Sequence, residues 1–128
     1  MSLTVPNDLL DQARAGDVDD AAFVACVRDS LPYAWELISE LVRTRTESGA
    51  SFADNMVPPP DEAARGQLLR CLASDAMRGA LERHFNVKLA FQNCHRVAVF
   101  DPSATAELAD FTTARAQILN QQPELVDC

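Results

Sequence analysis

The longest helical pattern in the sequence runs from Asp61 to Phe85 and leads directly into a strand pattern. At about 100° per residue, Gln67, Arg70 and Ser74 fall on the polar side of such a helix. The opposite side consists of leucines and alanines, namely Leu68, Leu69, Leu72, Ala73, Ala76 and Ala80. We therefore predict one long helix at the centre of the fold, with small residues that let another helix approach closely.

A strand pattern occupies residues 87–100. Apolar and polar residues alternate on both sides of Asn93-Cys94, as is typical of half-buried strands, and this pair is a plausible tight turn. The stretch predicts one antiparallel β-hairpin. Because an isolated hairpin is only marginally stable, we expect it to pack on helices or to pair with another edge.

Four shorter helices are expected besides the long one. Apolar residues three and four apart predict helices over residues 8–15, from Asp19 to Leu31, from Pro32 to Thr46, and from Pro102 to Ile118. Pro32 separates the second from the third, because proline lacks an N–H and disfavours helix at the preceding residue. Ser30 is placed to cap the third helix and Asp101 to cap the last, which ends at Pro123.

The segment from Glu47 to Pro60 has neither helical nor strand periodicity. Loops of this length in compact domains are usually functional or disordered. Phe52, Met56 and Val57 are expected to pin the loop to the core. Three consecutive prolines then favour an extended approach to the long helix. This loop is thus one of two segments in which a functional site is expected.

These patterns predict a mainly α fold of the α+β class, formed by a single domain over residues 1–128. About five helices pack around a central long helix, together with one antiparallel β-hairpin. A chain of 128 residues with 48% apolar residues is long and apolar enough to bury a substantial core.

The chain is acidic, and its charge is uneven. Eleven Lys and Arg against 19 Asp and Glu give a net charge of −8, which disfavours a general affinity for nucleic acid. Residues 61–100 are +2 and the remainder is −10. The first residues, MSLTVPNDLL, lack the basic and apolar regions of a signal peptide, and no apolar run has the length of a membrane span. We therefore expect a cytoplasmic protein with no nucleic-acid or membrane partner.

Cys94-His95 in the hairpin is the first candidate for chemistry. A thiolate paired with an imidazole is a nucleophile only where the side chains touch, and adjacent strand residues point to opposite faces. A turn would allow them to converge, with Asp54 or His84 supplying the missing partner. The simpler interpretation is a small thiol beside a surface histidine. Cys94, His95 and Asp54 are therefore catalytic candidates only if the protein is an enzyme, which we do not favour.

The four cysteines and two histidines show neither C-x-x-C nor H-x-x-x-H spacing. We therefore expect thiols rather than a disulfide framework, no metal site and no cofactor. Candidates for ligand binding are instead polar residues of the loop and the hairpin tip, namely Asn55, Asn93 and Arg96. These would line a pocket between loop 47–60 and hairpin 87–100.

The stretch FADN…PPPDEAARGQLLR and the phrase FQNCHRVAVF, with DSLPYAWELI and LNQQPELVDC, resemble a small family of uncharacterised actinobacterial proteins. The resemblance covers essentially the whole chain, and FQNCHRVAVF is its most distinctive part. It implies an intracellular bacterial protein, and it brings no activity or catalytic residues.

Two functional hypotheses follow from the sequence. We favour an interaction or regulatory module without catalytic activity that acts as a homodimer or with a protein partner. The reasons are the missing catalytic set and the unpaired hairpin and small-residue helix face, which would accept a partner. The alternative is a small enzyme or ligand-binding protein that uses the pocket between loop 47–60 and hairpin 87–100.

Overall fold

The computed structural model describes residues 3–121. In chain order its elements are α1 (Asn7–Ala15), α2 (Asp20–Ser30), α3 (Pro32–Ser48), β1 (Phe52–Asp54), α4 (Glu62–Ala73), α5 (Asp75–Phe85), β2 (Lys88–Gln92), β3 (Arg96–Phe100), α6 (Thr105–Phe111) and α7 (Ala114–Leu119). The predicted α+β class is confirmed. None of the described helices is long and apolar enough to cross a membrane. The predicted helix end at Pro123 and the predicted thiol of Cys128 lie outside the described residues.

The sheet has three strands in the order β1-β3-β2, and both pairings are antiparallel. β2 and β3 form the predicted hairpin, with Lys88 opposite Phe100. β1 comes from the segment expected to be a loop, and it pairs with the other edge of β3 so that Phe52 is also opposite Phe100. The hairpin is therefore part of a larger sheet, and β3 is the central strand.

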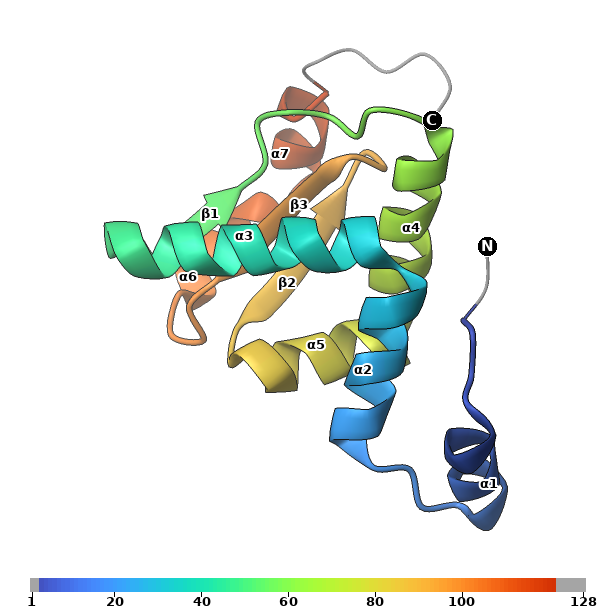
Figure 1. Cartoon of the computed structure of the whole chain (residues 1–128). Coiled ribbons are helices and arrows are strands. Elements are labelled where there is room, and N and C mark those ends of the chain that lie inside the picture. The colour runs from blue at the N-terminus through green and yellow to red at the C-terminus, as the bar shows by residue number, and fades with distance from the viewer. Residues whose placement is uncertain (1–2, 122–128) are drawn as a thin grey trace.

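Helices cover both faces of this sheet (Figure 1). α3, α4 and α5 lie on one face, where Ile38, Leu68 and Leu81 are fully buried, and α2 packs against α3 and α5. On the other face α6 places Phe111 edge-on against Phe100, with the ring centroids 5.6 Å apart. Every residue of β3 is buried, so this strand joins the two halves of the core.

The long helix expected over residues 61–85 is in fact two helices, α4 and α5, which meet at Ser74. Ser74 has an extended backbone, and its hydroxyl accepts a hydrogen bond from the Met77 N–H at 3.2 Å. The Arg78 guanidinium donates to the Leu72 carbonyl oxygen near the end of α4 at 2.9 Å. These side-chain bonds satisfy backbone groups at the junction, and they explain why the chain breaks where periodicity predicts continuity.

The longest described helix is α3, which lies across the sheet (Figure 1). It begins at Pro32, as predicted, and extends to Ser48, beyond its predicted end. The predicted cap is wrong, because the Ser30 hydroxyl accepts a hydrogen bond from the Thr4 N–H at 2.8 Å instead. Ser30 thus anchors the N-terminal segment rather than α3.

Gln67 of α4 supplies the cap that α3 lacks locally. Its Oε1 accepts hydrogen bonds from the backbone N–H groups of Tyr33 at 2.7 Å and Ala34 at 3.3 Å. These groups belong to the first turn of α3, where N–H groups have no partner within the helix. Gln67 is consequently buried, although its helical phase predicts an exposed position.

The last predicted helix is also divided. Asp101 does not cap a helix at Pro102, because its carboxylate accepts hydrogen bonds from the Ser103 N–H at 2.9 Å and the Ser103 hydroxyl at 2.6 Å. α6 starts only at Thr105. Thr113 then separates α6 from α7 and caps α7 with its side chain. Short polar side chains that bond locally thus replace one helix by two short ones.

Candidate functional site

Asn55 joins the segment predicted to be a loop, residues 47–60, to the hairpin. The hypothesis of a pocket between these two segments requires such a contact. Its N–H donates to the Val97 carbonyl oxygen at 3.2 Å, and its Oδ1 accepts a hydrogen bond from the Val97 N–H at 2.7 Å. Its Nδ2 donates to the His95 carbonyl oxygen at 2.7 Å. Asn55 therefore extends the β1–β3 pairing by one residue, with its side chain acting in place of backbone. Its contacts are internal, and it is only 6% exposed.

Arg96 lies beside Asn55 and is also buried. Its Nη1 donates to the Asp54 carboxylate at 3.2 Å and to the Asn55 carbonyl oxygen at 3.1 Å. The Met56 sulfur lies 3.4 Å from the same nitrogen. Because a guanidinium presents its donors in a fixed plane, this set of acceptors holds the end of β1 against β3.

Asn93 and Cys94 form the hairpin turn, with positive φ angles of 54° and 47°. The predicted turn is therefore confirmed. The Asn93 Nδ2 donates to the Gln117 carbonyl oxygen at 2.9 Å, which connects the turn to α7. Cys94 is disulfide-bonded, contrary to the expectation of a thiol at this position. Cys26 and Cys71 are free thiols, as predicted, and both are buried.

The His95 ring is 1% exposed, contrary to the simple interpretation of a surface histidine. Its Nδ1 lies 2.6 Å from the Asn93 carbonyl oxygen, so the imidazole is committed to the turn backbone. Its Nε2 has no hydrogen-bond partner within the described part of the chain. The Cys94, His95 and Asp54 catalytic set stays a prediction, and this geometry gives it no support.

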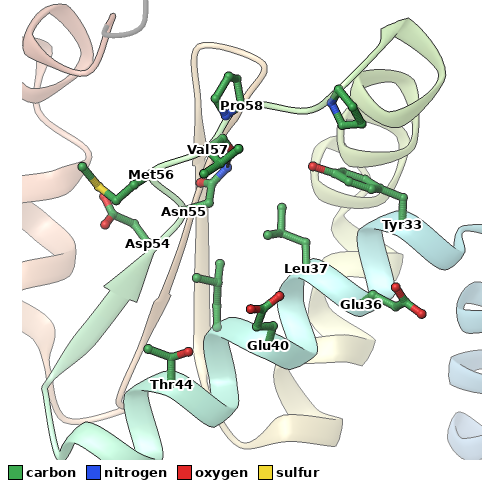
Figure 2. A pocket seen from close by; sticks show the side chains of 12 residues that line it. Tyr33, Glu36, Leu37, Glu40, Thr44, Asp54, Asn55, Met56, Val57 and Pro58 are labelled. Carbon is green, nitrogen blue, oxygen red and sulfur yellow. Dashed lines mark hydrogen bonds between the residues drawn. The ribbon is translucent and has the colours of Figure 1, made fainter.

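A groove of about 560 Å³ lies next to this polar cluster, between α3 and residues 54–60 (Figure 2). We call it the α3 groove. Its helical wall consists of Tyr33, Glu36, Leu37, Glu40, Leu41 and Thr44, and its other wall of residues 54–58 and Pro60. Figure 2 shows Leu37 and the hydroxyl end of Tyr33 pointing toward the loop wall. The groove thus lies between the loop and α3. The sequence predicts instead a pocket between loop 47–60 and hairpin 87–100.

The apolar side chains of the loop wall do not reach the core. Met56 and Val57 are each 74% exposed, so the expectation that they pin the loop to the core is wrong. Phe52 is 40% exposed and stacks on Phe100 with the ring centroids 5.3 Å apart. Phe52 therefore anchors the loop to the core, as predicted, and the hydrogen bonds of Asn55 hold the residues that follow. Large exposed apolar side chains beside a groove are typical of interaction or ligand sites.

The helical wall of the groove is acidic. Glu36 and Glu40 lie one turn apart on α3, and neither forms an ion pair among residues 3–121. No Lys or Arg belongs to the described lining. Burial, together with the nearby Asp61 carboxylate, raises the pKa of the Tyr33 phenol. Tyr33 therefore stays protonated at neutral pH and offers a hydroxyl to the groove.

Sequence patterns identify the loop wall of the groove but miss the α3 wall. Glu36 and Glu40 are exposed, as their helical phase indicates, yet nothing in the sequence places them opposite the loop. One signal was available. Leu37 is apolar but does not belong to the stripe of α3 residues that faces the core. An apolar residue outside that stripe indicates that the helix has a second apolar contact surface.

The fold and the groove define a small α+β protein with an open surface site of mixed apolar and acidic character. Within residues 3–121, no group of three or more His, Cys, Asp or Glu side chains is placed to hold a metal ion. The chain belongs to the family described as NucS shadow ORF, whose profile matches residues 1–128 and whose name carries the prefix KH. No curated protein and no solved structure matches the chain. The family description contains no activity or ligand.

Proposed function

We propose that the protein is a non-catalytic interaction module that binds a segment of another protein in the α3 groove. One observation carries this proposal: Met56 and Val57 are three-quarters exposed at the edge of an open groove. Apolar side chains in this setting gain free energy when a partner removes them from water. The expected bacterial and cytoplasmic setting stays a prediction of the sequence.

Catalysis receives less support, because the polar residues that would perform it are bonded within the fold. Arg96 is bonded to Asp54, and the Asn55 amide is bonded to β3. The α3 groove has a volume of about 560 Å³, which falls within the range of small-molecule pockets. Binding of a small ligand there is therefore the alternative function.

Nucleic-acid binding is not proposed, despite the KH prefix of the family name. KH modules clamp the nucleic-acid backbone with a GXXG loop. The four glycines of this chain are Gly16, Gly49, Gly66 and Gly79, and no two of them are three residues apart. The clamp is thus missing from the sequence, and a net charge of −8 repels phosphate.

The reason for a homodimer that came from the hairpin is weakened, since the β3 edge of the hairpin is paired with β1 and only the outer edge of β2 lacks a strand partner within residues 3–121. The small-residue face of α5 is also occupied in part, because Ala80 is fully buried and α5 packs against α2. Two copies of a chain with a charge of −8 repel each other. We therefore propose a different protein as the partner in the groove.

Site-specific photo-crosslinking tests this function. Val57 is replaced by p-benzoylphenylalanine in cells that express the chain, and Leu69 of α4, 51% exposed and outside the groove, is replaced in a matched control. After irradiation, we expect the variant at position 57 to form a discrete adduct with one other protein, and Met56→Asp to abolish it. Identical adducts at both positions, or none at position 57, would contradict the proposal.

A further inference from the structure

We propose that the α3 groove selects a partner segment that carries an arginine or lysine between apolar residues. This inference rests on the proposed interaction function, and it adds the chemistry of the partner. The groove offers two kinds of surface at once: carboxylates on α3, and apolar side chains on both walls. A cationic side chain with apolar neighbours complements both.

The two glutamates of the groove lack a partner of opposite charge. Glu36 and Glu40 are four residues apart on one helix, where two like charges face each other and destabilise the helix. Neither forms an ion pair in the described structure. The third carboxylate of the lining, Asp54, differs because Arg96 is bonded to it. A cation from a partner would therefore relieve the repulsion at α3, where no ion pair of the described structure does so.

Tyr33 adds a second reason for a cationic guest. Its ring lines the same wall as Glu36, and its hydroxyl end points into the space between α3 and the loop (Figure 2). Burial first, and then the Asp61 carboxylate, raise the pKa of the phenol, so Asp61 adds a third negative charge close to Tyr33. A guanidinium or ammonium near an aromatic face and beside carboxylates is a favourable arrangement.

The neighbours of that cation should be apolar. Leu37 and Leu41 lie on the helical wall, and Met56, Val57 and Pro58 lie on the loop wall. Met56 adapts to different partner shapes, because its side chain is unbranched and polarizable. An entirely polar basic segment would leave these surfaces in contact with water, so the groove favours a segment of mixed character.

The test uses a blocked tetrapeptide, Ac-Leu-Arg-Leu-Leu-NH2, and its citrulline analogue, in which the guanidinium becomes a neutral urea of similar shape. Binding is followed by ¹H–¹⁵N NMR titration of the full chain. We expect the arginine peptide to shift the amide signals of the groove lining and to bind about five-fold more tightly than the citrulline peptide. Added salt should reduce that difference.

Variants separate the glutamates from the rest of the surface. Glu36→Gln and Glu40→Gln should each weaken the arginine peptide by up to about five-fold and leave the citrulline peptide unchanged. Glu47→Gln is the matched control, because Glu47 is an exposed glutamate of α3 outside the groove lining. We expect Glu47→Gln to leave the affinities for the arginine peptide and for the citrulline peptide essentially unchanged.

The outcomes distinguish this inference from the proposed function. Equal binding of both peptides in the groove would overturn the selection of a cation and leave the docking function standing. Shifts from neither peptide at the groove would overturn both. Sedimentation equilibrium tests whether a second copy of the chain occupies the groove. A dimer that Val57→Asp dissociates would show that it does, and this result would overturn both proposals.

Discussion

Gln67 shows how one polar side chain can organise two helices. Its Oε1 accepts hydrogen bonds from two backbone N–H groups at the start of α3, at 2.7 and 3.3 Å. Gln67→Ala would leave both donors in a buried site, so we expect a loss of about 2 kcal/mol in the free energy of unfolding. Urea denaturation measures it. Gln12→Ala is the control, since Gln12 accepts from the exposed Asp19 N–H and water can replace it. Equal losses in the two variants would contradict the capping role.

Cys71 is a second residue whose environment has a measurable consequence. Burial raises the pKa of its thiol from an ordinary 9.0 to about 12. The folded state therefore retains the proton where the unfolded state loses it. The stability contributed by the neutral thiol is complete below pH 9 and declines as the pH rises toward 12, by at most about 1.4 kcal/mol per pH unit.

The comparison of wild type with Cys71→Ala isolates this effect, because other groups that titrate in alkali are common to both. We expect the difference in unfolding free energy between the two proteins to shrink as the pH is raised above 9. A difference that stays constant up to pH 11 would show that the thiol is not protected from ionisation in the fold.

Part of the candidate site can be predicted from individual residues. The sequence predicts that loop 47–60 lies beside the hairpin tip, and Asp54 and Asn55 of the loop do contact residues 96 and 97 of the hairpin. Polar residue types, however, do not reveal whether their groups face one another or a ligand. Here they face one another. The groove beside them depends on the position of α3, which is set by tertiary packing rather than by any local pattern.

Ser74 determines the arrangement of elements in the helical layer. The leucine and alanine pattern continues across it, so periodicity alone predicts one helix where α4 and α5 form two. The missing information was chemical: serine is a favoured N-cap, and Asp75 follows it in the first turn of α5. β1 was missed for another reason. It is only three residues long, too short for strand alternation to be recognised.

If Ser74 ends α4 by capping α5, its replacement should lower the free energy of unfolding as the loss of a helix cap does. Ser74→Ala removes the acceptor of the Met77 N–H bond, and we expect a loss of about 1 kcal/mol in unfolding free energy. Ser74→Asp retains an acceptor and should recover most of it. Thermal denaturation followed by circular dichroism measures both variants. Stability unchanged in Ser74→Ala, or raised by it, would favour a continuous helix over residues 61–85.

At the scale of the whole molecule, charge governs which partners can approach. A net charge of −8 and the absence of a GXXG sequence lead us to expect no saturable binding to single-stranded RNA or DNA. Fluorescence anisotropy with labelled oligonucleotides at low salt is the most permissive measurement, because low salt strengthens phosphate contacts. Saturable binding that weakens as salt rises would contradict this prediction and would favour a nucleic-acid-binding function.

The two halves of the core are joined through β3, so we expect them to unfold together. Trp35, the only tryptophan, contacts Phe85 with the ring centroids 5.1 Å apart on the helical face, whereas Phe111 packs on the opposite face. Phe111→Ala should cost about 3–5 kcal/mol and lower the midpoint seen by Trp35 fluorescence as much as the midpoint seen by circular dichroism.

Coincident transitions would show that α6 and the helical layer form one cooperative unit. A fluorescence transition that Phe111→Ala leaves in place would show instead that α2–α5 and the sheet fold without α6. One sharp transition, sensitive to a side chain on the far face of the sheet, is the behaviour expected of a single cooperative fold whose two half-cores share β3.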